Sequence, residues 1–227
     1  MTRPDAANDP DDLPTRPWDR DDALIDAVRA GGGPAMAAYA WDQVAVVIGR
    51  GGRQADELHR DRIAADGVPL LRRPGGGCAV VLDPGNVIAS LVLPLPGIGG
   101  ITRAFDAISD HLIAALDRCG VPGVTRQGVS DLTLGDRKIG GSCIWRTRGL
   151  VYYSTTVLVN PDPAIVDRYL PHPPREPSYR GGRPHRLFMG SLRSAGLADD
   201  APGLAGRLQV AIFQDLMILD DMCREKS

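Results

Sequence analysis

The chain has 227 residues, a formal net charge of −2 and only 5% aromatic residues. This length is typical of one domain, or of one domain with a small appendage. It is enough to bury a stable hydrophobic core without disulfide bonds or a structural metal. A net charge near zero disfavours a nucleic-acid-binding protein, which needs a basic surface to displace counterions. The longest apolar stretch, residues 87–95, is too short to span a bilayer. We therefore expect neither a nucleic-acid nor a membrane partner.

The N-terminus and the cysteines indicate where the protein works. Residues 1–21 are rich in Asp and Pro and lack the basic and apolar regions of a secretory signal, so we expect a flexible N-terminal arm. The cysteines at positions 78, 119, 143 and 223 form no C-x-x-C pair, and the four histidines have no metal-binding spacing. The sequence therefore predicts a cytoplasmic protein with reduced thiols and no metal site of its own.

The first half of the chain predicts short strands and helices. Helices are expected at 22–29 and 53–66, with Gly67 as the left-handed C-cap of the second. The sequence D-P-G-N at 83–86 predicts a hairpin between the strands on either side of it. The clearest expected helix covers 102–119, with its apolar residues along one stripe. Apolar, β-branched runs predict strands at 43–48, 68–71, 78–82 and 87–93.

The second half predicts a β section followed by helices. Turn signals divide residues 130–159 into an expected three-stranded meander, and 171–184 is an expected loop. Helices are expected at 164–170, 185–192 and 204–222.

Hairpins and a meander, mixed with separated helices, are typical of one fold class. The predicted class is α+β, with a mostly antiparallel central β-sheet flanked by helices. The glycine cluster at 49–53 matches no nucleotide-binding pattern and is interpreted as a turn. We expect residues 22–227 to form a single catalytic domain.

Two segments carry side chains suited to chemistry. Arg72 and Arg73 directly precede three glycines between two strands, and this combination suits a carboxylate or a phosphate. The alternative is a tight turn with two solvated arginines. Further along, Lys138 precedes Ile-Gly-Gly at a strand start, where its ammonium can reach an anionic group. The alternative is a surface lysine in a β-turn.

Together these segments resemble the lipoate–protein ligase family, which includes octanoyltransferases and biotin–protein ligases. The resemblance rests on R-R-x-x-G-G-x-A-V-x-x-D-x-G-N at 72–86, S-D-L at 130–132 and R-K-I-G-G-S at 137–142. It covers roughly residues 43–192, and the stretch from Tyr169 to His185 resembles a subgroup of short lipoate-ligase-like proteins. The resemblance implies the catalytic-domain fold of the biotin and lipoate ligases.

The resemblance also implies acyl-adenylate chemistry. Lipoate and ATP, with Mg²⁺, would give lipoyl-AMP and pyrophosphate, and a lysine of a lipoyl carrier protein would then attack the mixed anhydride. Lys138 would sit at the reacting centre and Asp131 would orient the adenylate. Asn86 would support the glycine segment or serve only as a turn residue. The other residues implied in binding lipoate or ATP are Arg72, Arg73, Gly75, Gly76, Gly77, Gly140, Gly141, Ser142 and Thr156.

The sequence departs from the family pattern at three places. The usual S-G-G-G-A reads G-G-G-C-A from Gly75 to Ala79, the expected H-G-T reads Ser154-Thr155-Thr156, and Ser130 replaces an asparagine. These departures leave open a different acyl group. They also leave two alternatives: an ATP-independent octanoyl or lipoyl transferase that uses a cysteine thioester, and a catalytically silent acyl-binding protein. The candidate nucleophiles are Cys143 and Cys78.

Longer members of the family carry a C-terminal accessory domain. Residues 194–227 can supply one helix, so we expect a separate accessory polypeptide to complete the protein. Arginines in the expected 171–184 loop and just after it are candidate contacts for that polypeptide or for an acidic lipoyl domain, and the alternative is a solvated loop. These arginines are Arg175, Arg180, Arg183 and Arg186.

Overall fold

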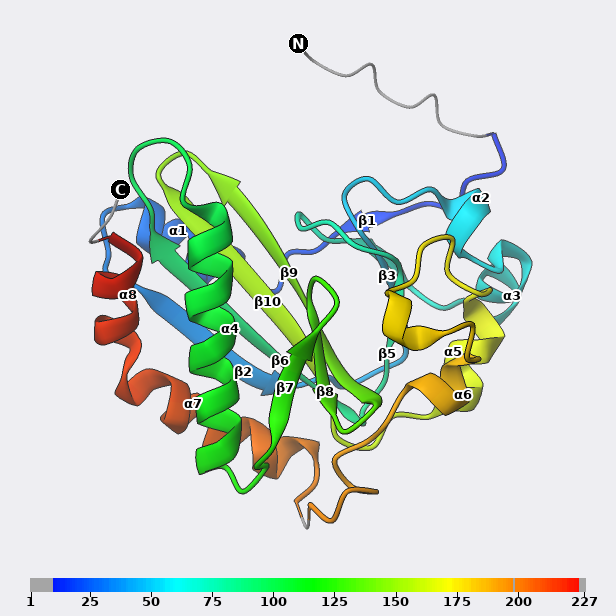
Figure 1. Cartoon of the computed structure of the whole chain (residues 1–227). Coiled ribbons are helices and arrows are strands. Elements are labelled where there is room, and N and C mark those ends of the chain that lie inside the picture. The colour runs from blue at the N-terminus through cyan, green and yellow to red at the C-terminus, as the bar shows by residue number, and fades with distance from the viewer. Residues whose placement is uncertain (1–9, 198, 225–227) are drawn as a thin grey trace.

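The structure is a computed structural model, and it describes residues 10–197 and 199–224. Its main feature is a six-stranded antiparallel sheet (Figure 1). The strand order is β2 (Ala35–Ala40), β6 (Asn86–Pro94), β10 (Leu150–Leu158), β9 (Arg137–Thr147), β8 (Asp131–Leu134) and β7 (Val124–Gln127). The predicted α+β class with a mostly antiparallel central sheet is confirmed.

A second, smaller sheet lies beside the large one. In this sheet β1 and β3 run parallel to β4, and β5 runs antiparallel to β3. Its strand order is β1 (Arg16–Pro17), β4 (Leu70–Arg72), β3 (Ala45–Ile48) and β5 (Val80–Leu82). Four short helices contribute to this half of the domain: α2 (Gln54–Glu57), α3 (Arg60–Asp66), α5 (Pro163–Tyr169) and α6 (His185–Phe188).

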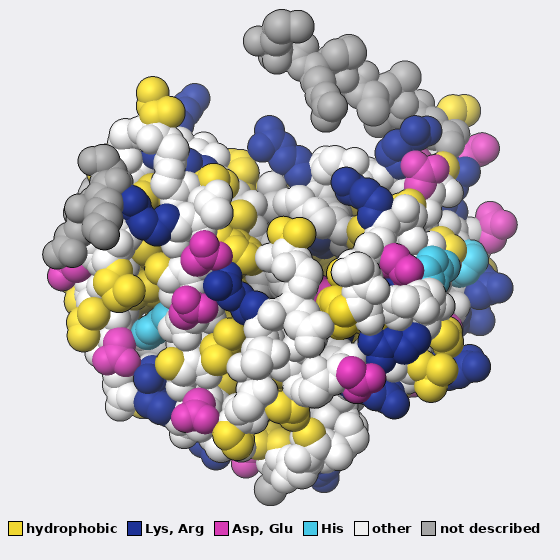
Figure 2. Space-filling view, in the orientation of Figure 1, with side chains coloured by type: hydrophobic (Ala, Val, Ile, Leu, Met, Phe, Trp, Pro, Cys, Tyr) yellow, Lys and Arg dark blue, Asp and Glu magenta, His cyan; other side chains and the backbone are white. Residues whose placement is uncertain are grey.

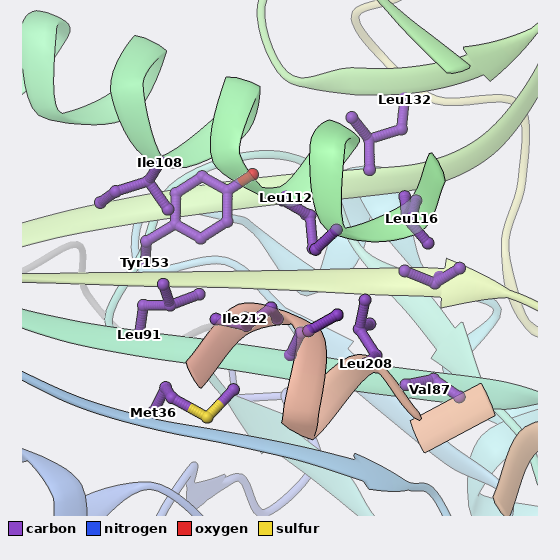
Figure 3. Packing of buried hydrophobic residues seen from close by; sticks show 14 of the residues in the cluster. Met36, Val87, Leu91, Ile108, Leu112, Leu116, Leu132, Tyr153, Leu208 and Ile212 are labelled. Atoms are coloured by element: carbon purple, nitrogen blue, oxygen red, sulfur yellow. The ribbon is translucent and has the colours of Figure 1, made fainter. Parts of the chain in front are cut away.

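The largest core lies between the six-stranded sheet and the helices α4 (Ile101–Arg118), α7 (Ala201–Gln214) and α8 (Leu216–Arg224). Figure 3 shows Leu112 and Leu116 of α4 facing the apolar side chains of the sheet. Helix α1 (Asp22–Arg29) packs elsewhere, where Ile25 and Val28 belong to the same buried cluster as Tyr152. Since neighbouring residues of a strand point to opposite faces, Tyr153 belongs to the core under α4 and Tyr152 does not.

The meander β8–β9–β10, helix α1, helix α4 and the left-handed Gly67 are confirmed as predicted. The predicted hairpin across residues 83–86 is wrong. Strand β5 pairs with β3, whereas β6 pairs with β2 and β10. The Gly85 carbonyl accepts from the amides of Val159 and Asn160, so this turn carries the chain from one sheet to the other.

Two predicted helices are broken. The 53–66 helix is divided into α2 and α3 because Leu58 adopts an extended conformation and the His59 amide donates to the Tyr169 carbonyl. The 204–222 helix is divided at Asp215, although apolar residues on both sides of the break are buried: Leu204, Leu208, Ile212, Leu216 and Leu219. The expected 185–192 helix is limited to α6. Within the described residues, no helix is long and apolar enough to cross a membrane.

The described part of the expected N-terminal arm is attached to the domain. Residues 1–9 lie outside the described residues, but β1 pairs with β4, and Trp18 stacks on Trp41 with ring centroids 5.3 Å apart. Asp21 is 1% exposed and accepts hydrogen bonds from Trp18 Nε1 at 2.8 Å and Tyr152 Oη at 2.7 Å. Residues 16–21 are therefore part of the folded domain and not a flexible arm.

Candidate active site

A cavity of about 990 Å³ is lined by residues of both sheets. Its lining includes apolar side chains of β3 and β5, residues 76–79 of the glycine segment, the β8–β9 hairpin and parts of the 171–180 stretch. A space of this size holds a small organic ligand together with a nucleotide. The cavity therefore brings together the two segments that the sequence selected.

Arg73 shapes the glycine segment from inside the cavity lining. Its guanidinium donates to the carbonyls of Gly76 at 2.9 Å, Cys78 at 2.7 Å and Val47 at 3.2 Å. Gly77 has a φ of +95°, a conformation that side chains strongly disfavour. The segment is therefore held in a fixed curve with a permanent positive charge beside it.

Three of the predicted binding residues lie outside the cavity lining: Arg72, Gly75 and Asn86. Arg72 donates to the carbonyls of Gly49 at 3.0 Å and Gly52 at 3.2 Å, so it supports the 49–52 turn. Asn86 is fully buried, and its Oδ1 accepts from the Asp83 amide at 3.0 Å, which is the turn role that the sequence left open. Gly75 packs against Cys143, because a Cβ at position 75 would lie 2.6 Å from the Cys143 sulfur.

Lys138 lies on β9 and forms an ion pair with Asp131 of β8, with 2.7 Å between Nζ and Oδ1. The register between these strands shifts at Leu132/Thr133, and this irregularity turns Lys138 toward the cavity. The Lys138 side chain is 26% exposed and that of Asp131 is 10% exposed. A cation that is partly shielded from water interacts strongly with an anionic group in the same cavity.

The residues that follow Lys138 give it room. A Cβ on Gly141 would lie 3.0 Å from Lys138 Nζ, and one on Gly140 would lie 2.8 Å from the Thr156 carbonyl oxygen. Glycine at 141 lets the lysine lie across the strand, and glycine at 140 lets β9 approach Thr156 of β10 closely. Ser142, also in the lining, accepts from Tyr153 Oη at 2.7 Å. The predicted residues Gly140, Gly141, Ser142 and Thr156 therefore surround Lys138 in one cavity.

Both candidate nucleophilic cysteines line the cavity. Burial raises the pKa of the Cys143 thiol, which lowers the thiolate fraction at neutral pH. The Cys78 sulfur lies 3.7 Å from the Arg175 carbonyl oxygen. Their position is compatible with a thioester, but burial makes Cys143 a weak nucleophile.

The sequence did not assign a site role to several side chains that line the cavity or contact its lining residues. Tyr179 donates to Asp131 Oδ2 at 2.8 Å, and Glu57 accepts from the Ala79 amide. Trp18 also lines the cavity, held by Asp21. The partners of Tyr179 and Glu57 are distant in sequence, so no local pattern could have revealed these two residues.

The four arginines proposed as partner contacts differ in environment. The Arg180 side chain is 5% exposed, and its guanidinium carbon lies 4.7 Å from the centre of the Phe188 ring. Arg183 donates to Asp136 Oδ2 at 2.9 Å. Arg175 and Arg186 are exposed. Arg180 is therefore too buried to serve as a candidate partner contact or to belong to a solvated loop.

Residues 14–199 match the model of the lipoyl protein ligase A/B catalytic domain. The match covers most of the chain, so the chain belongs to this family. This confirms the resemblance inferred from the two motifs.

Known relatives carry the name lipoate–protein ligase. A lipoate–protein ligase of Streptococcus pyogenes is 27% identical over 173 residues, which are 76% of this chain and 49% of the relative. Lipoate-protein ligase A of Psychrobacter cryohalolentis is 34% identical over 131 residues, which are 56% of this chain and 36% of the relative. The chain spans about half or less of the length of the curated relatives it matches.

Solved structures share the fold. One is a bi-partite lipoate protein ligase with its E2 lipoyl domain from Thermoplasma acidophilum, with a TM-score of 0.69, 20% identity and coverage of 91% of this chain and 81% of that one. Another is a lipoate-protein ligase A bound with ATP, with a TM-score of 0.67, 22% identity and coverage of 91% and 83%. These matches confirm the predicted catalytic-domain fold.

Proposed function

We propose that this chain is an ATP-dependent lipoate–protein ligase that activates lipoate as lipoyl-AMP. The observation that carries the proposal is the Lys138–Asp131 pair, which faces the same cavity as the glycine segment held by Arg73. Family membership supports it, and so does the description of solved relatives with bound lipoic acid and with ATP.

The proposed first step joins two anions. A lipoate carboxylate oxygen attacks the α-phosphorus of ATP, and the bond to pyrophosphate breaks. Lys138 stabilises the negative charge that builds on the reacting oxygens, and this contact is stronger in the transition state than in the ground state. In the second step the amine of a carrier lysine attacks the acyl carbon, loses a proton and releases AMP.

We assign the binding roles by position in the cavity. The backbone of Gly76 and Gly77, with Arg73 beside it, suits the carboxylate and the phosphate, and Gly140, Gly141, Ser142 and Thr156 line the same space. Among the described residues, no cluster of three or more metal-ligating side chains is present. We therefore propose that Mg²⁺ enters on the phosphates of ATP, as it does in many nucleotide sites.

Pyrophosphate release tests the proposed function. We expect the purified chain, mixed with lipoate and Mg-ATP, to release pyrophosphate and form lipoyl-AMP only weakly by itself, and faster with the accessory polypeptide proposed below. Acyl transfer from acyl-carrier protein without ATP would favour the transferase instead. Tight lipoate binding without turnover would favour the silent binding protein.

Replacing Arg73 with alanine should weaken ATP binding about ten- to a hundred-fold, because charge-assisted hydrogen bonds contribute about 1.5–3 kcal/mol each. Arg72→Ala is the matched control. It also removes contacts to backbone carbonyls, but outside the cavity lining. Titration calorimetry should show an affinity within about threefold of wild type for this control, since most effects outside a site are small. Equal affinities of the two variants would remove Arg73 from the binding site.

The cysteines separate the ligase from the transferase. A ligase needs neither thiol, so Cys78→Ala and Cys143→Ser should each keep ATP-dependent turnover. A transferase would lose all turnover in one of them, because its acyl group passes through the sulfur. Mass spectrometry after incubation with an acylated acyl-carrier protein gives the second readout, and a trapped thioester would favour the transferase over the ligase.

We further propose that the acceptor is a lipoyl carrier protein and that an accessory polypeptide assists the ligase. A solved relative is described as bi-partite and was determined with its E2 lipoyl domain. Exposed apolar side chains on α7 and α8, gathered over α8 in Figure 2, support an additional partner. They are Val210, Phe213, Met217, Ile218 and Met222. Faster pyrophosphate release with that polypeptide than without it would support this proposal.

The state of the cysteines indicates the cellular compartment in which the protein works. The four cysteines are all free. Free thiols are typical of a reducing compartment, which supports our proposal that the protein works in the cytoplasm.

A further inference from the structure

The Asp131 carboxylate has a different partner on each oxygen. Oδ1 is paired with Lys138 Nζ at 2.7 Å, and Oδ2 accepts a hydrogen bond from Tyr179 Oη at 2.8 Å. Asp131 is only 7% exposed. Two partners on opposite oxygens fix both the position and the plane of a carboxylate. The orientation of the oxygen that faces Lys138 therefore depends on Tyr179.

Tyr179 is itself held in place. Its ring packs against Phe188 with centroids 5.2 Å apart, and its carbonyl accepts from Arg183 Nη2 at 3.0 Å. The same Arg183 donates to the side chain and the backbone carbonyl of Asp136, at 2.9 and 3.0 Å. Asp136 lies in the β8–β9 turn that leads into Lys138. Arg183 thus links Tyr179 to the β8–β9 hairpin, which carries Lys138.

The phenol of Tyr179 remains a donor. Burial, and then the hydrogen bond to Asp131, raise the pKa of Tyr179. The hydroxyl therefore stays protonated at neutral pH and gives its proton to Asp131 as a hydrogen bond. Neutral donor and carboxylate acceptor form a charge-assisted bond, which is stronger than a bond between neutral groups.

We propose that Tyr179 is a positioning residue for Lys138, acting through Asp131. A lysine ammonium ends a flexible four-carbon stem, so its position is defined only by its contacts. By holding Oδ2, Tyr179 directs Oδ1 toward Nζ and places the ammonium where charge develops. A misplacement of about 1 Å can cost about a hundred-fold in rate. This inference rests on the role proposed for Lys138.

Tyr179→Phe tests the inference, with Tyr169→Phe as its matched control. Tyr169 Oη also donates to a carboxylate, that of Asp66, at 2.7 Å, but Asp66 lies outside the cavity lining, whereas Asp131 belongs to it. We expect Tyr179→Phe to lower kcat for lipoate-dependent ATP–pyrophosphate exchange about ten- to a hundred-fold, with both KM values within about twofold. Tyr169→Phe should keep wild-type kcat. Equal kcat for the two variants would overturn the inference.

A double variant tests whether Tyr179 acts through Asp131. Adding Tyr179→Phe to Asp131→Asn should change kcat by less than about twofold, because the orienting carboxylate is already lost. If the two effects multiply, Tyr179 acts by another route and the inference fails. Melting temperatures of all variants check that the fold is kept.

A readout without turnover makes the two proposals separable. Lys138 and Lys226 are the only lysines in the sequence. In protein carrying ¹³C-labelled lysine, Tyr179→Phe should shift the side-chain NMR signal of Lys138 and leave that of Lys226 unchanged. An unmoved Lys138 signal would refute the positioning role. A moved signal in a chain that never releases pyrophosphate would refute the proposed function and leave the Tyr179–Asp131–Lys138 link standing.

Discussion

Replacing Lys138 with alanine should lower the rate of lipoyl-AMP formation by about a hundred- to a thousand-fold, the cost of removing one preorganised electrostatic contact. The loss should appear in kcat more than in substrate affinity, because the ammonium is proposed to act on charge that develops in the transition state. Single-turnover measurement of lipoyl-AMP checks this.

Arg29→Ala is the control for that variant. Arg29 is a cation on α1, is paired with Asp26, and lies outside the cavity lining. Its removal should leave the rate unchanged. A Lys138→Ala protein that retains its fold and forms lipoyl-AMP at the wild-type rate would remove Lys138 from the mechanism.

The second large effect concerns stability. Asp21→Ala should lower the free energy of unfolding by roughly 3–5 kcal/mol, because each buried donor left without an acceptor costs about 1–3 kcal/mol. The orphaned donors would be Trp18 Nε1 and Tyr152 Oη, and Ser90 Oγ would lose a 2.9 Å bond. Urea unfolding monitored by tryptophan fluorescence measures the change.

Asp26→Ala is the comparison for Asp21. Asp26 is also an aspartate at the start of the domain, but its side chain is 69% exposed and pairs with Arg29 on the same helix. Its removal should change stability by less than about 1 kcal/mol, as for other surface ion pairs. Equal unfolding midpoints for the two variants would show that Asp21 does not anchor the N-terminal segment.

Local patterns predicted the elements that depend on local signals. Helix α4 follows from its apolar stripe, and the β8–β10 meander follows from its turn residues. Strand β2, with the sequence AMAAYA, was not predicted because alanine has little strand preference and its pairing with β6 is set by distant residues. The wrong hairpin at 83–86 has the same cause, since the turn residues were read correctly but the strand partners are non-local.

The residues of the candidate site also differ in whether a local sequence pattern could reveal them. Lys138 and the glycine segment could be found because their residues are adjacent in sequence. Tyr179 lies 48 residues from Asp131, and Tyr152 lies 131 residues from Asp21, so no spacing rule joins them. Arg72 and Arg73 are neighbours with different partners, because successive residues of an extended chain point to opposite sides.

The contact between Gly75 and Cys143 changes how one departure from the family pattern should be understood. A Cβ at position 75 would lie 2.6 Å from the sulfur and 2.7 Å from the Cβ of Cys143. The serine that the pattern expects at 75 would therefore need glycine at 143 or a displaced glycine segment. The glycine at 75 is therefore explained by its contact with Cys143, and this departure from the family pattern does not by itself point to a different acyl group.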